Sequence, residues 1–416
     1  MNRTFVSASL VALVCSSTVA LAQEWTRFRG PNGSGISSAT TVPVQFSPGD
    51  YNWRIELPGR GHSSPVVWGN KIFITSAEEQ TGRRHLLCVS AKDGKELWRR
   101  TYDFKPYHLH EFNAAAASTP AIDAERIYLV MPEDGAFVVA ALDHEGREVW
   151  KRNLGAFPTQ HGGSSSPIVV GDVLVVNREP EDSSGSLLGL DVKTGATRWH
   201  RDRDSKACPY ATPSLYEPKG EPAEVIFAST AHGVTSLDPK TGELNWELPD
   251  LTKLRCVASP LIVNGLVYMA SGQGDGGRQA VAVRPGSKKA KTEPKVEYKI
   301  ARGPSYVPSP IAVDGRIYAW GDAGIVSCIK AETGEVLWQE RVGGNFFGSP
   351  VCVNGKLYAI SAKGEVVVIE AGNQFKLLGR SDLGEGSHST PAVSGGVMYL
   401  RTTSHLISVG GKKTPN

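Results

Sequence analysis

The sequence lacks helical periodicity, a long apolar run and a surplus of charge of one sign. Apolar residues almost nowhere recur at the spacing of an amphipathic helix, which argues against a helical domain. The apolar run from Phe5 to Val14 is too short for a membrane-spanning helix. With 45 Lys and Arg against 42 Asp and Glu, the formal net charge is only +3. No general field that would attract nucleic acid or a membrane surface is therefore implied.

Adjacent cysteines are also missing. Cys88 and Cys328 hold the same position in two distant repeats, which is typical of small buried hydrophobic residues. Cys208 and Cys256 lie in consecutive repeats, so a disulfide between them stays open for an exported protein, with two buried free thiols as the favoured alternative. The remaining cysteines are Cys352 and, within the first residues of the chain, Cys15.

Glycine and proline are abundant, and they mark a repeat. A phrase of Ser/Thr-Pro, a few β-branched residues, an Asn-Gly-like turn and an aliphatic–aromatic pair recurs every roughly 40 to 55 residues, which indicates a propeller or a solenoid. Eight copies agree with the number of blades in large propellers. The copies begin at Ser64, Thr119, Ser166, Thr212, Ser259, Ser309, Ser349 and Thr390.

The repeat from Ser309 to Trp338 shows why each copy predicts one blade. Pro310 can only begin a strand, because it has no N–H for a position inside a sheet. Asp314-Gly315 supplies the positive φ angles of a two-residue hairpin. Two further turns, at residues 322–324 and 333–334, divide the rest into short strands. We therefore expect an all-β fold, an eight-bladed β-propeller of four-stranded antiparallel blades.

A Gly-x-x-x-Trp ending closes five of the repeats. These tryptophans are expected to pack between neighbouring blades, where each would bury roughly 150–250 Å². The fifth repeat lacks the Trp, and Tyr298 is expected to replace it. The five tryptophans are Trp98, Trp150, Trp199, Trp246 and Trp338.

The eighth repeat, from Ser389 to Val409, ends one strand short. Residues 52–57 precede the first Ser-Pro and carry their own Trp53, so we expect them to supply the missing outer strand. A ring closed in this way leaves no long free sheet edge. The expected organisation is a signal peptide over 1–22, an N-terminal segment with the ring-closing strand over 23–60, the propeller over 61–410 and a C-terminal tail over 411–416.

The first 22 residues have the features of a signal peptide. Arg3 gives a positive start, an apolar core follows, and Ala20-Leu21-Ala22 forms a cleavage site before Gln23. Lipidation at Cys15 is disfavoured, because Val14 precedes it where a small residue is expected. We therefore expect an exported protein of the periplasm or cell envelope.

Polar residues precede the Ser/Thr-Pro of most repeats, and a propeller would gather them at the mouth of its channel. A ring of His, Arg and Tyr there predicts a polar or anionic ligand, or a peptide, bound over the channel. The alternative is that these groups satisfy one another and channel water. The candidate ligand-binding residues are Arg60, His62, His161, Tyr210, Arg255, Tyr306 and His388.

The segment His108-Leu109-His110-Glu111 has residue types that bind metals. It lies in the long connection between the first and second repeats, so we interpret it as a solvated or locally hydrogen-bonded loop. No metal ligand and no catalytic residue are predicted.

The repeat phrase and the Gly-x-x-x-Trp endings together resemble the PQQ-like β-propeller repeat family, from Trp25 to Val409. The opening Trp25-Thr26-Arg27-Phe28-Arg29-Gly30-Pro31-Asn32-Gly33-Ser34-Gly35 is similar to the N-terminal signature of its exported, BamB-like branch. The family includes quinoprotein dehydrogenases and the assembly protein BamB, both eight-bladed. Fold resemblance alone does not decide between their functions.

The resemblance implies two different functions, and the cysteines of this chain distinguish between them. Quinoprotein dehydrogenases hold PQQ above a vicinal Cys-Cys disulfide and use a Ca²⁺ ion, and this chain has no Cys-Cys pair. We therefore expect no cofactor and a non-catalytic scaffold that binds a protein partner in the cell envelope, as in outer-membrane protein assembly. A small anionic ligand is a further expectation. The alternative is a PQQ-dependent dehydrogenase, or another enzyme with a site at the channel mouth.

Overall fold

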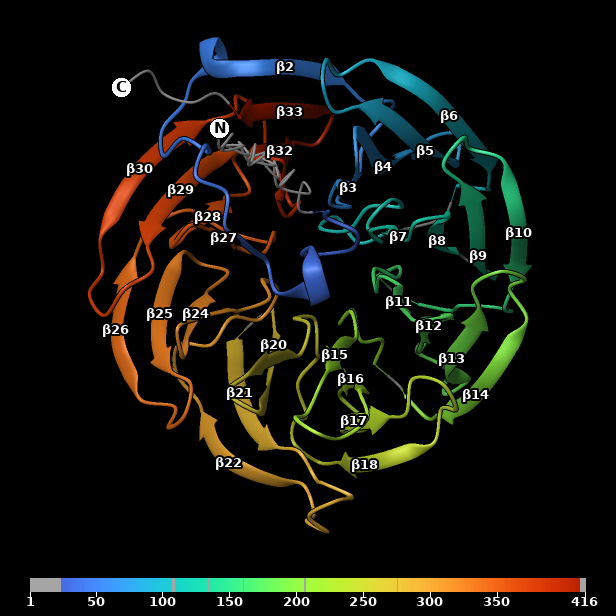
Figure 1. The fold of residues 1–416 in the computed structure, drawn as a ribbon, viewed down its shortest axis with the longest axis vertical. Helices are drawn as coiled ribbons and strands as arrows, with labels where there is room; N and C mark the ends of the chain where they lie inside the picture. The colour runs from blue at the N-terminus through green and yellow to red at the C-terminus, as the bar shows by residue number, and fades with distance from the viewer. Residues whose placement is uncertain are drawn as a thin grey trace, which may run out of the picture.

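Eight β-sheets follow one another in chain order around a central channel (Figure 1). The computed structural model describes residues 24–106, 109–133, 135–159, 161–205, 207–274 and 276–411. The predicted signal peptide and residues 412–416 of the predicted tail lie outside the described residues. The prediction of an all-β, eight-bladed propeller of four-stranded antiparallel blades is confirmed.

In the first four blades, four consecutive strands form each sheet, from the channel outwards. They are β3 (Val66–Trp68), β4 (Lys71–Glu78), β5 (Arg83–Ser90) and β6 (Glu96–Asp103); β7 (Ala121–Ile122), β8 (Arg126–Glu133), β9 (Ala136–Asp143) and β10 (Glu148–Asn153); β11 (Ile168–Val170), β12 (Val173–Arg178), β13 (Gly185–Asp191) and β14 (Thr197–Arg203); and β15 (Ser214–Tyr216), β16 (Glu224–Ser229), β17 (Gly233–Leu237) and β18 (Leu244–Leu248).

The last four blades continue this order. They contain β19 (Leu261–Val263), β20 (Leu266–Gln273), β21 (Gly276–Arg284) and β22 (Lys295–Ile300); β23 (Ile311–Val313), β24 (Arg316–Trp320), β25 (Ile325–Lys330) and β26 (Val336–Arg341); β27 (Val351–Val353), β28 (Lys356–Ile360), β29 (Glu365–Glu370) and β30 (Leu377–Asp382); and β31 (Ala392–Ser394), β32 (Val397–Arg401) and β33 (His405–Gly410).

The N-terminal segment contributes the two remaining strands. β2 (Tyr51–Glu56) pairs antiparallel with β33 and completes the eighth blade, so the predicted ring closure is confirmed. β1 (Ile36–Ser37), which the sequence did not predict, adds a parallel strand to the inner edge of the seventh blade through β27. Two short 3-10 helices, η1 (Pro31–Gly33) and η2 (Pro48–Asp50), precede these strands.

The hairpin turns form as the repeat phrase predicts. Asp314 and Gly315 have φ angles of 48° and 73°, and Val313 pairs with Arg316 across the turn. Two residues with positive φ match the twist of the flanking strands, and Gly tolerates this conformation at no steric cost.

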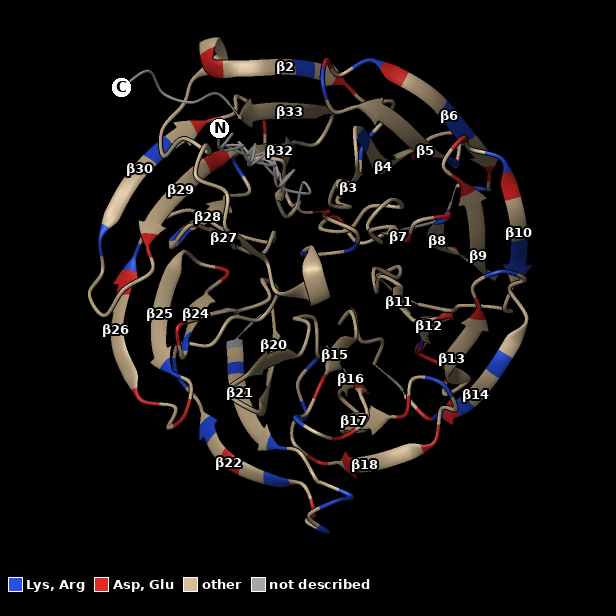
Figure 2. Ribbon diagram, viewed as in Figure 1, with Lys and Arg blue, Asp and Glu red and all other residues tan. Residues whose placement is uncertain are grey.

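The hydrophobic core lies between neighbouring blades, distributed around the ring. Between the first and second blades, for example, Phe73 and Leu86 pack with Ile127 and Leu129, and all four side chains are buried. Lys, Arg, Asp and Glu residues are spread over the outer strands and turns (Figure 2). Each blade is therefore stabilised by its two neighbours.

The outer tryptophans join neighbouring blades, as predicted. The indole Nε1 of Trp150 donates to the carbonyl oxygen of Val192 (3.0 Å), and that of Trp199 donates to the carbonyl oxygen of Pro239 (3.0 Å). The Trp199 ring lies directly against Gly242 of the next blade, where a Cβ atom would be 2.7 Å from the ring. This close approach explains why a glycine occupies that turn in the repeats.

Two positions vary this arrangement. Tyr298 replaces the missing tryptophan, as predicted, and its hydroxyl donates to the carbonyl oxygen of Ala331 (2.6 Å). Trp246 departs from the pattern, because its indole N–H donates to the Glu224 carboxylate of its own blade (2.8 Å).

A second set of contacts joins the blades at the channel. In seven of the eight repeats, the backbone N–H of the Ser/Thr before the repeat's proline donates to the hydroxyl oxygen of the equivalent residue in the next blade. Examples are Ser166 to Thr212 (3.1 Å) and Thr212 to Ser259 (3.2 Å). Seven such bonds, which we call the hydroxyl belt, run from Ser64 to Thr390.

At the ring closure a different contact replaces the belt. The Ser64 hydroxyl has no partner among the described residues. The buried Arg401 instead donates through Nη1 to the Ser63 hydroxyl (2.8 Å) and to the carbonyl oxygen of Thr75 (2.6 Å). A charged side chain of the eighth blade thus anchors the first blade.

The N-terminal segment crosses the channel before it reaches β1. Figure 1 shows this blue segment inside the ring of blades. Trp25 exchanges backbone hydrogen bonds with Val67 of the first blade. Asn32 bonds the backbone of Leu215 in the fourth blade, and Gly35 accepts from Cys352 in the seventh. We call residues 24–37 the plug.

Replacing Gly242 by Ala is expected to destabilise the fold more than replacing Gly265. Their φ angles are +71° and +72°, so both variants should lose about 1–2 kcal/mol to left-handed strain. Only at Gly242 does the new methyl group meet the Trp199 ring, which should cost about 1–3 kcal/mol more. Urea unfolding measures both losses, and equal losses would contradict the close approach.

The hydroxyl belt predicts a second pair of unequal variants. Thr212→Val removes the acceptor for the buried N–H of Ser166 and should cost about 1–3 kcal/mol. Ser64→Ala removes a hydroxyl without a described partner and should change the stability by less than about 0.5 kcal/mol. Calorimetric melting of both variants tests this, and a large loss for Ser64→Ala would show that the belt is closed by a bond to that hydroxyl.

Candidate functional site

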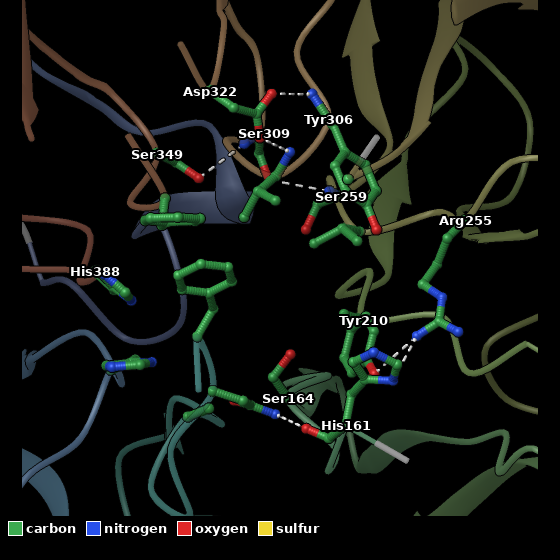
Figure 3. A pocket seen from close by; sticks show the side chains of 18 of the residues that line it. His161, Ser164, Tyr210, Arg255, Ser259, Tyr306, Ser309, Asp322, Ser349 and His388 are labelled. Carbon is green, nitrogen blue, oxygen red and sulfur yellow. Dashed lines mark hydrogen bonds between the residues drawn. The ribbon is translucent and has the colours of Figure 1, made fainter. Parts of the chain in front are cut away.

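A cavity of about 930 Å³ opens at the channel mouth. The connections that lead into the innermost strands line it, and the Ser/Thr hydroxyls of the belt form part of its wall (Figure 3). Phe28 of the plug also lines it, so the N-terminal segment provides part of its floor. We call this space the mouth cavity.

Six of the seven predicted site residues line the mouth cavity: His62, His161, Tyr210, Arg255, Tyr306 and His388. Arg60 does not. Its Nε lies 2.7 Å from a carboxylate oxygen of Glu79, in an ion pair outside the lining. The position of Arg60 in the repeat predicts that its backbone lies near the mouth. Its side chain lies outside the cavity lining because it pairs with the Glu79 carboxylate.

One wall of the mouth cavity is polar and centred on Arg255. Its Nη1 lies 3.2 Å from His161 Nδ1 and donates to the Tyr210 hydroxyl at 3.2 Å (Figure 3). Its Nη2 lies 3.0 Å from a carboxylate oxygen of Glu181. Arg255 therefore contributes a positive charge that Glu181 already compensates.

Asp322 is the single carboxylate among the described residues that line the mouth cavity. It accepts backbone N–H bonds from Tyr306 (3.0 Å) and Val307 (2.9 Å), and Arg278 Nε lies 3.3 Å away. These partners satisfy the carboxylate in a structural role, holding the connection that carries Tyr306.

The opposite wall is aromatic. Phe112 and Phe347 stack with ring centroids 5.3 Å apart, and Phe347 packs on His388 at 4.3 Å. His388 in turn lies 4.6 Å from His62. Phe112 remains 53% exposed, so part of this aromatic wall faces solvent.

The sequence analysis missed Phe112 and interpreted the segment with His110 as a loop. In the structure the His110 ring lies 4.8 Å from that of His161 and 5.3 Å from that of Phe112. His108 lies outside the described residues, whereas residues 109–113 form no helix or strand, as interpreted, and carry His110 and Phe112 to the mouth. The unusual length of this connection was the feature of the sequence that could have indicated its role at the mouth.

The mouth histidines favour their neutral form. Burial, followed by the nearby His388, Arg401 and Arg60, holds the pKa of His62 well below 6.5. Burial and then Arg255 lower the pKa of His161. His62 and His161 therefore gain their positive charge at a lower pH than 6.5, the value for an unperturbed histidine.

The residues of the mouth cavity do not fit the quinone chemistry of the alternative function. All five described cysteines are free and buried, and Cys208 and Cys256 form no disulfide. Burial raises the pKa of the Cys256 thiol to about 12. Within the described ranges, no group of three or more His, Cys, Asp or Glu side chains could hold a metal ion. A vicinal disulfide platform and a carboxylate set for Ca²⁺ are both missing from the described lining.

Comparisons with known proteins place this fold in a family. The sequence matches the family described as outer membrane protein assembly factor BamB over residues 44–208, 180–301 and 299–412. A curated BamB from Burkholderia pseudomallei is 33% identical over 292 residues, 68% of this chain and 66% of that protein. The crystal structure of BamB from Moraxella catarrhalis superposes with a TM-score of 0.62 at 17% identity, covering 88% of this chain and 98% of that one.

A europium-containing methanol dehydrogenase superposes equally well, with a TM-score of 0.62 at 13% identity, covering 92% of this chain and 90% of that one. Structural likeness at such low identity shows the fold alone. The repeats and their geometry define a PQQ-like eight-bladed β-propeller. Within that class, the sequence match to the BamB family covers most of the propeller. The chain therefore belongs to the BamB family.

The histidine pKa shifts predict a loss of stability in mild acid. The unfolded chain takes up protons near pH 6.5, whereas folded His62 resists protonation, so unfolding becomes easier as the pH falls below about 6.5. His62→Gln should remove about 1 kcal/mol of the loss between pH 7 and 5. Urea titrations at both pH values measure it, with His200→Gln, at a half-exposed outer-strand histidine, as control. An unchanged pH dependence in His62→Gln would contradict the assignment.

Proposed function

We propose that this chain is an exported, non-catalytic scaffold of the cell envelope that takes part in outer-membrane protein assembly. The observation that carries the proposal is the family match, which extends through the propeller from residue 44 to residue 412. The relatives are named as outer-membrane protein assembly factors, and the predicted signal peptide agrees with export. In the described part of the chain, no helix is long and apolar enough to span a membrane.

The mouth is the surface that we propose for the protein partner. It combines an exposed aromatic side chain, Phe112, with a cavity whose Arg255 and Asp322 already have counter-charges. Such a surface favours an extended segment with an apolar side chain, which could enter the cavity while its backbone meets the polar wall. An anionic ligand at the same place remains a prediction, and the Arg255–Glu181 pair weakens it.

Deleting the gene in the source organism should lower the amount of folded β-barrel protein in the outer membrane. The wild-type chain should restore it, and Phe112→Asp should restore it poorly. Leu97→Asp is the matched control, because Leu97 is 50% exposed on β6, the outer strand of the first blade. Full restoration by Phe112→Asp would contradict the mouth as the partner surface, and unchanged barrel levels after deletion would contradict the assembly function.

The dehydrogenase alternative has its own test. Titration with PQQ and Ca²⁺ should give no saturable spectral change and no dye-linked alcohol oxidation, because the platform residues are missing. A turnover that depends on both additions would overturn the scaffold proposal.

A further inference from the structure

A second cavity, of about 400 Å³, opens at the other ends of the inner strands. Strand β15 begins just after Thr212, which lines the mouth cavity, and ends at Tyr216, which lines this second cavity. The second cavity therefore lies on the face opposite to the mouth. Leu215, Tyr216 and Ile262 of its lining are half-buried, so the fourth and fifth blades offer it apolar surface. We call this space the rear groove.

The connection from β21 to β22 forms a compact turn on the same face. β20 ends at Gln273, which lines the mouth cavity, so the antiparallel β21 ends on the opposite face, at Arg284. Ser287 and Thr292 then exchange backbone hydrogen bonds of 3.0 and 3.1 Å. Figure 1 shows this connection extending outside the ring of blades. We call residues 287–292 the lysine turn, because it carries Lys288, Lys289 and Lys291.

A carboxylate at the rim of the rear groove holds the lysine turn in place. Glu221 follows the groove residues 217–219, and its Oε1 accepts from the Ser287 hydroxyl at 2.7 Å. Its Oε2 accepts from the backbone N–H of Lys289 at 3.4 Å, and the Ser287 hydroxyl accepts from the N–H of Ala290 at 2.8 Å. The turn is thus ordered before any partner binds, which lowers the entropy that binding costs.

The lysine turn carries charge that the described residues do not compensate. Its three lysines are exposed, and no ion pair joins them to a described carboxylate, whereas the nearby Arg284 and Lys295 both pair with Glu297. Residues 217–221 and 284–299 together contain seven Lys and Arg against four Glu, a surplus of +3. The whole chain has the same net charge, so this small region is strongly positive for its size.

The positive surplus and the apolar surface lie side by side. Glu217 and Lys219 both line the rear groove and offset each other, so the surplus belongs to the lysine turn. Anionic lipids would meet the lysines but would leave the groove empty, and a small free anion would leave its apolar lining uncovered. An extended protein segment can use both features, with an apolar side chain in the groove and carboxylates at the lysines.

We propose that the rear groove and the lysine turn together bind an acidic, extended segment of a partner protein. This surface lies opposite to the mouth, so it goes beyond the function proposed above and adds a second contact of different chemistry. A scaffold with both surfaces can hold two segments at the same time.

The direct test measures binding of an acidic peptide to the full chain. The probe is a short fluorescein-labelled peptide of glutamates with a central Leu-Phe pair, followed by fluorescence anisotropy. Saturable binding is expected, and it should weaken as sodium chloride is added, because salt screens the exposed lysines. A peptide with Ser-Ser in place of Leu-Phe should bind about tenfold more weakly, because it leaves the groove unfilled. Absence of saturable binding, or equal affinity for both peptides, would overturn the proposal.

Exposed lysines can be replaced without disturbing the fold, so variants can locate the site. Changing Lys288, Lys289 and Lys291 together to Gln should lower the affinity about five- to tenfold. The matched control changes Lys92, Lys95 and Lys105 to Gln, which removes the same charge from exposed positions of the first blade and its following connection. It should bind within about twofold of the wild type. An equal loss in both variants would mean that general charge attraction, and no site, holds the peptide.

The ordering of the turn has a separate test. Ser287→Ala breaks the contact with Glu221 and removes no lysine, so the affinity should fall about two- to fivefold. Unchanged affinity in this variant would contradict the role of the ordered turn.

Two further measurements separate this proposal from its alternatives. Phe112→Asp should bind the acidic peptide as the wild type does, whereas loss of binding in that variant would place the peptide at the mouth and overturn the rear site. Sedimentation with phosphatidylglycerol vesicles should pull down little protein. Vesicle binding that depends on the three lysines, without peptide binding, would assign the lysine turn to a lipid surface instead.

Discussion

The hydroxyl belt at the channel is the interaction on which the other features of this propeller depend. Proline after each Ser/Thr disfavours the helical conformation of that residue and keeps its backbone extended. Its hydroxyl can then accept the N–H of the preceding blade, as Thr212 does from Ser166. The belt holds the starts of the inner strands at the same level. It therefore sets both the outline of the mouth cavity and the channel that the plug crosses.

The ring has one closure, and a different chemistry stabilises it. There the belt lacks a bond to the Ser64 hydroxyl, β2 supplies the outer strand, and Arg401 anchors the first blade to the eighth. The two termini of the propeller thus meet through backbone pairing at the rim and a buried cation near the channel. Arginine suits this position because its several donors can meet acceptors from β4 and from the connection that precedes β3 together.

The arginines near the mouth have glutamate partners in ion pairs, whereas those of the plug have none among the described residues. At the mouth Arg255 faces Glu181, and outside the cavity lining Arg60 faces Glu79, so the two arginines that the sequence suggests for ligand binding are already neutralised. In the plug, Arg27 donates to the carbonyl oxygen of Pro213, and no ion pair joins Arg27 or Arg29 to a carboxylate of the described residues. The shared fold accommodates both scaffolds and dehydrogenases, and side chains such as these decide which chemistry a member can perform.

The repeat architecture, the ring closure and the replacement of tryptophan by Tyr298 could be predicted from the sequence. Each rests on local patterns: strand alternation, two-residue turns, and a conformation that proline imposes on its neighbour. These patterns also placed six of the seven predicted residues at the mouth. The direction of the Arg60 side chain, the position of Phe112 and the path of the plug were decided only by the tertiary structure. Irregular segments have no periodicity to fix their side chains, so contacts between residues far apart in the sequence determine where they lie.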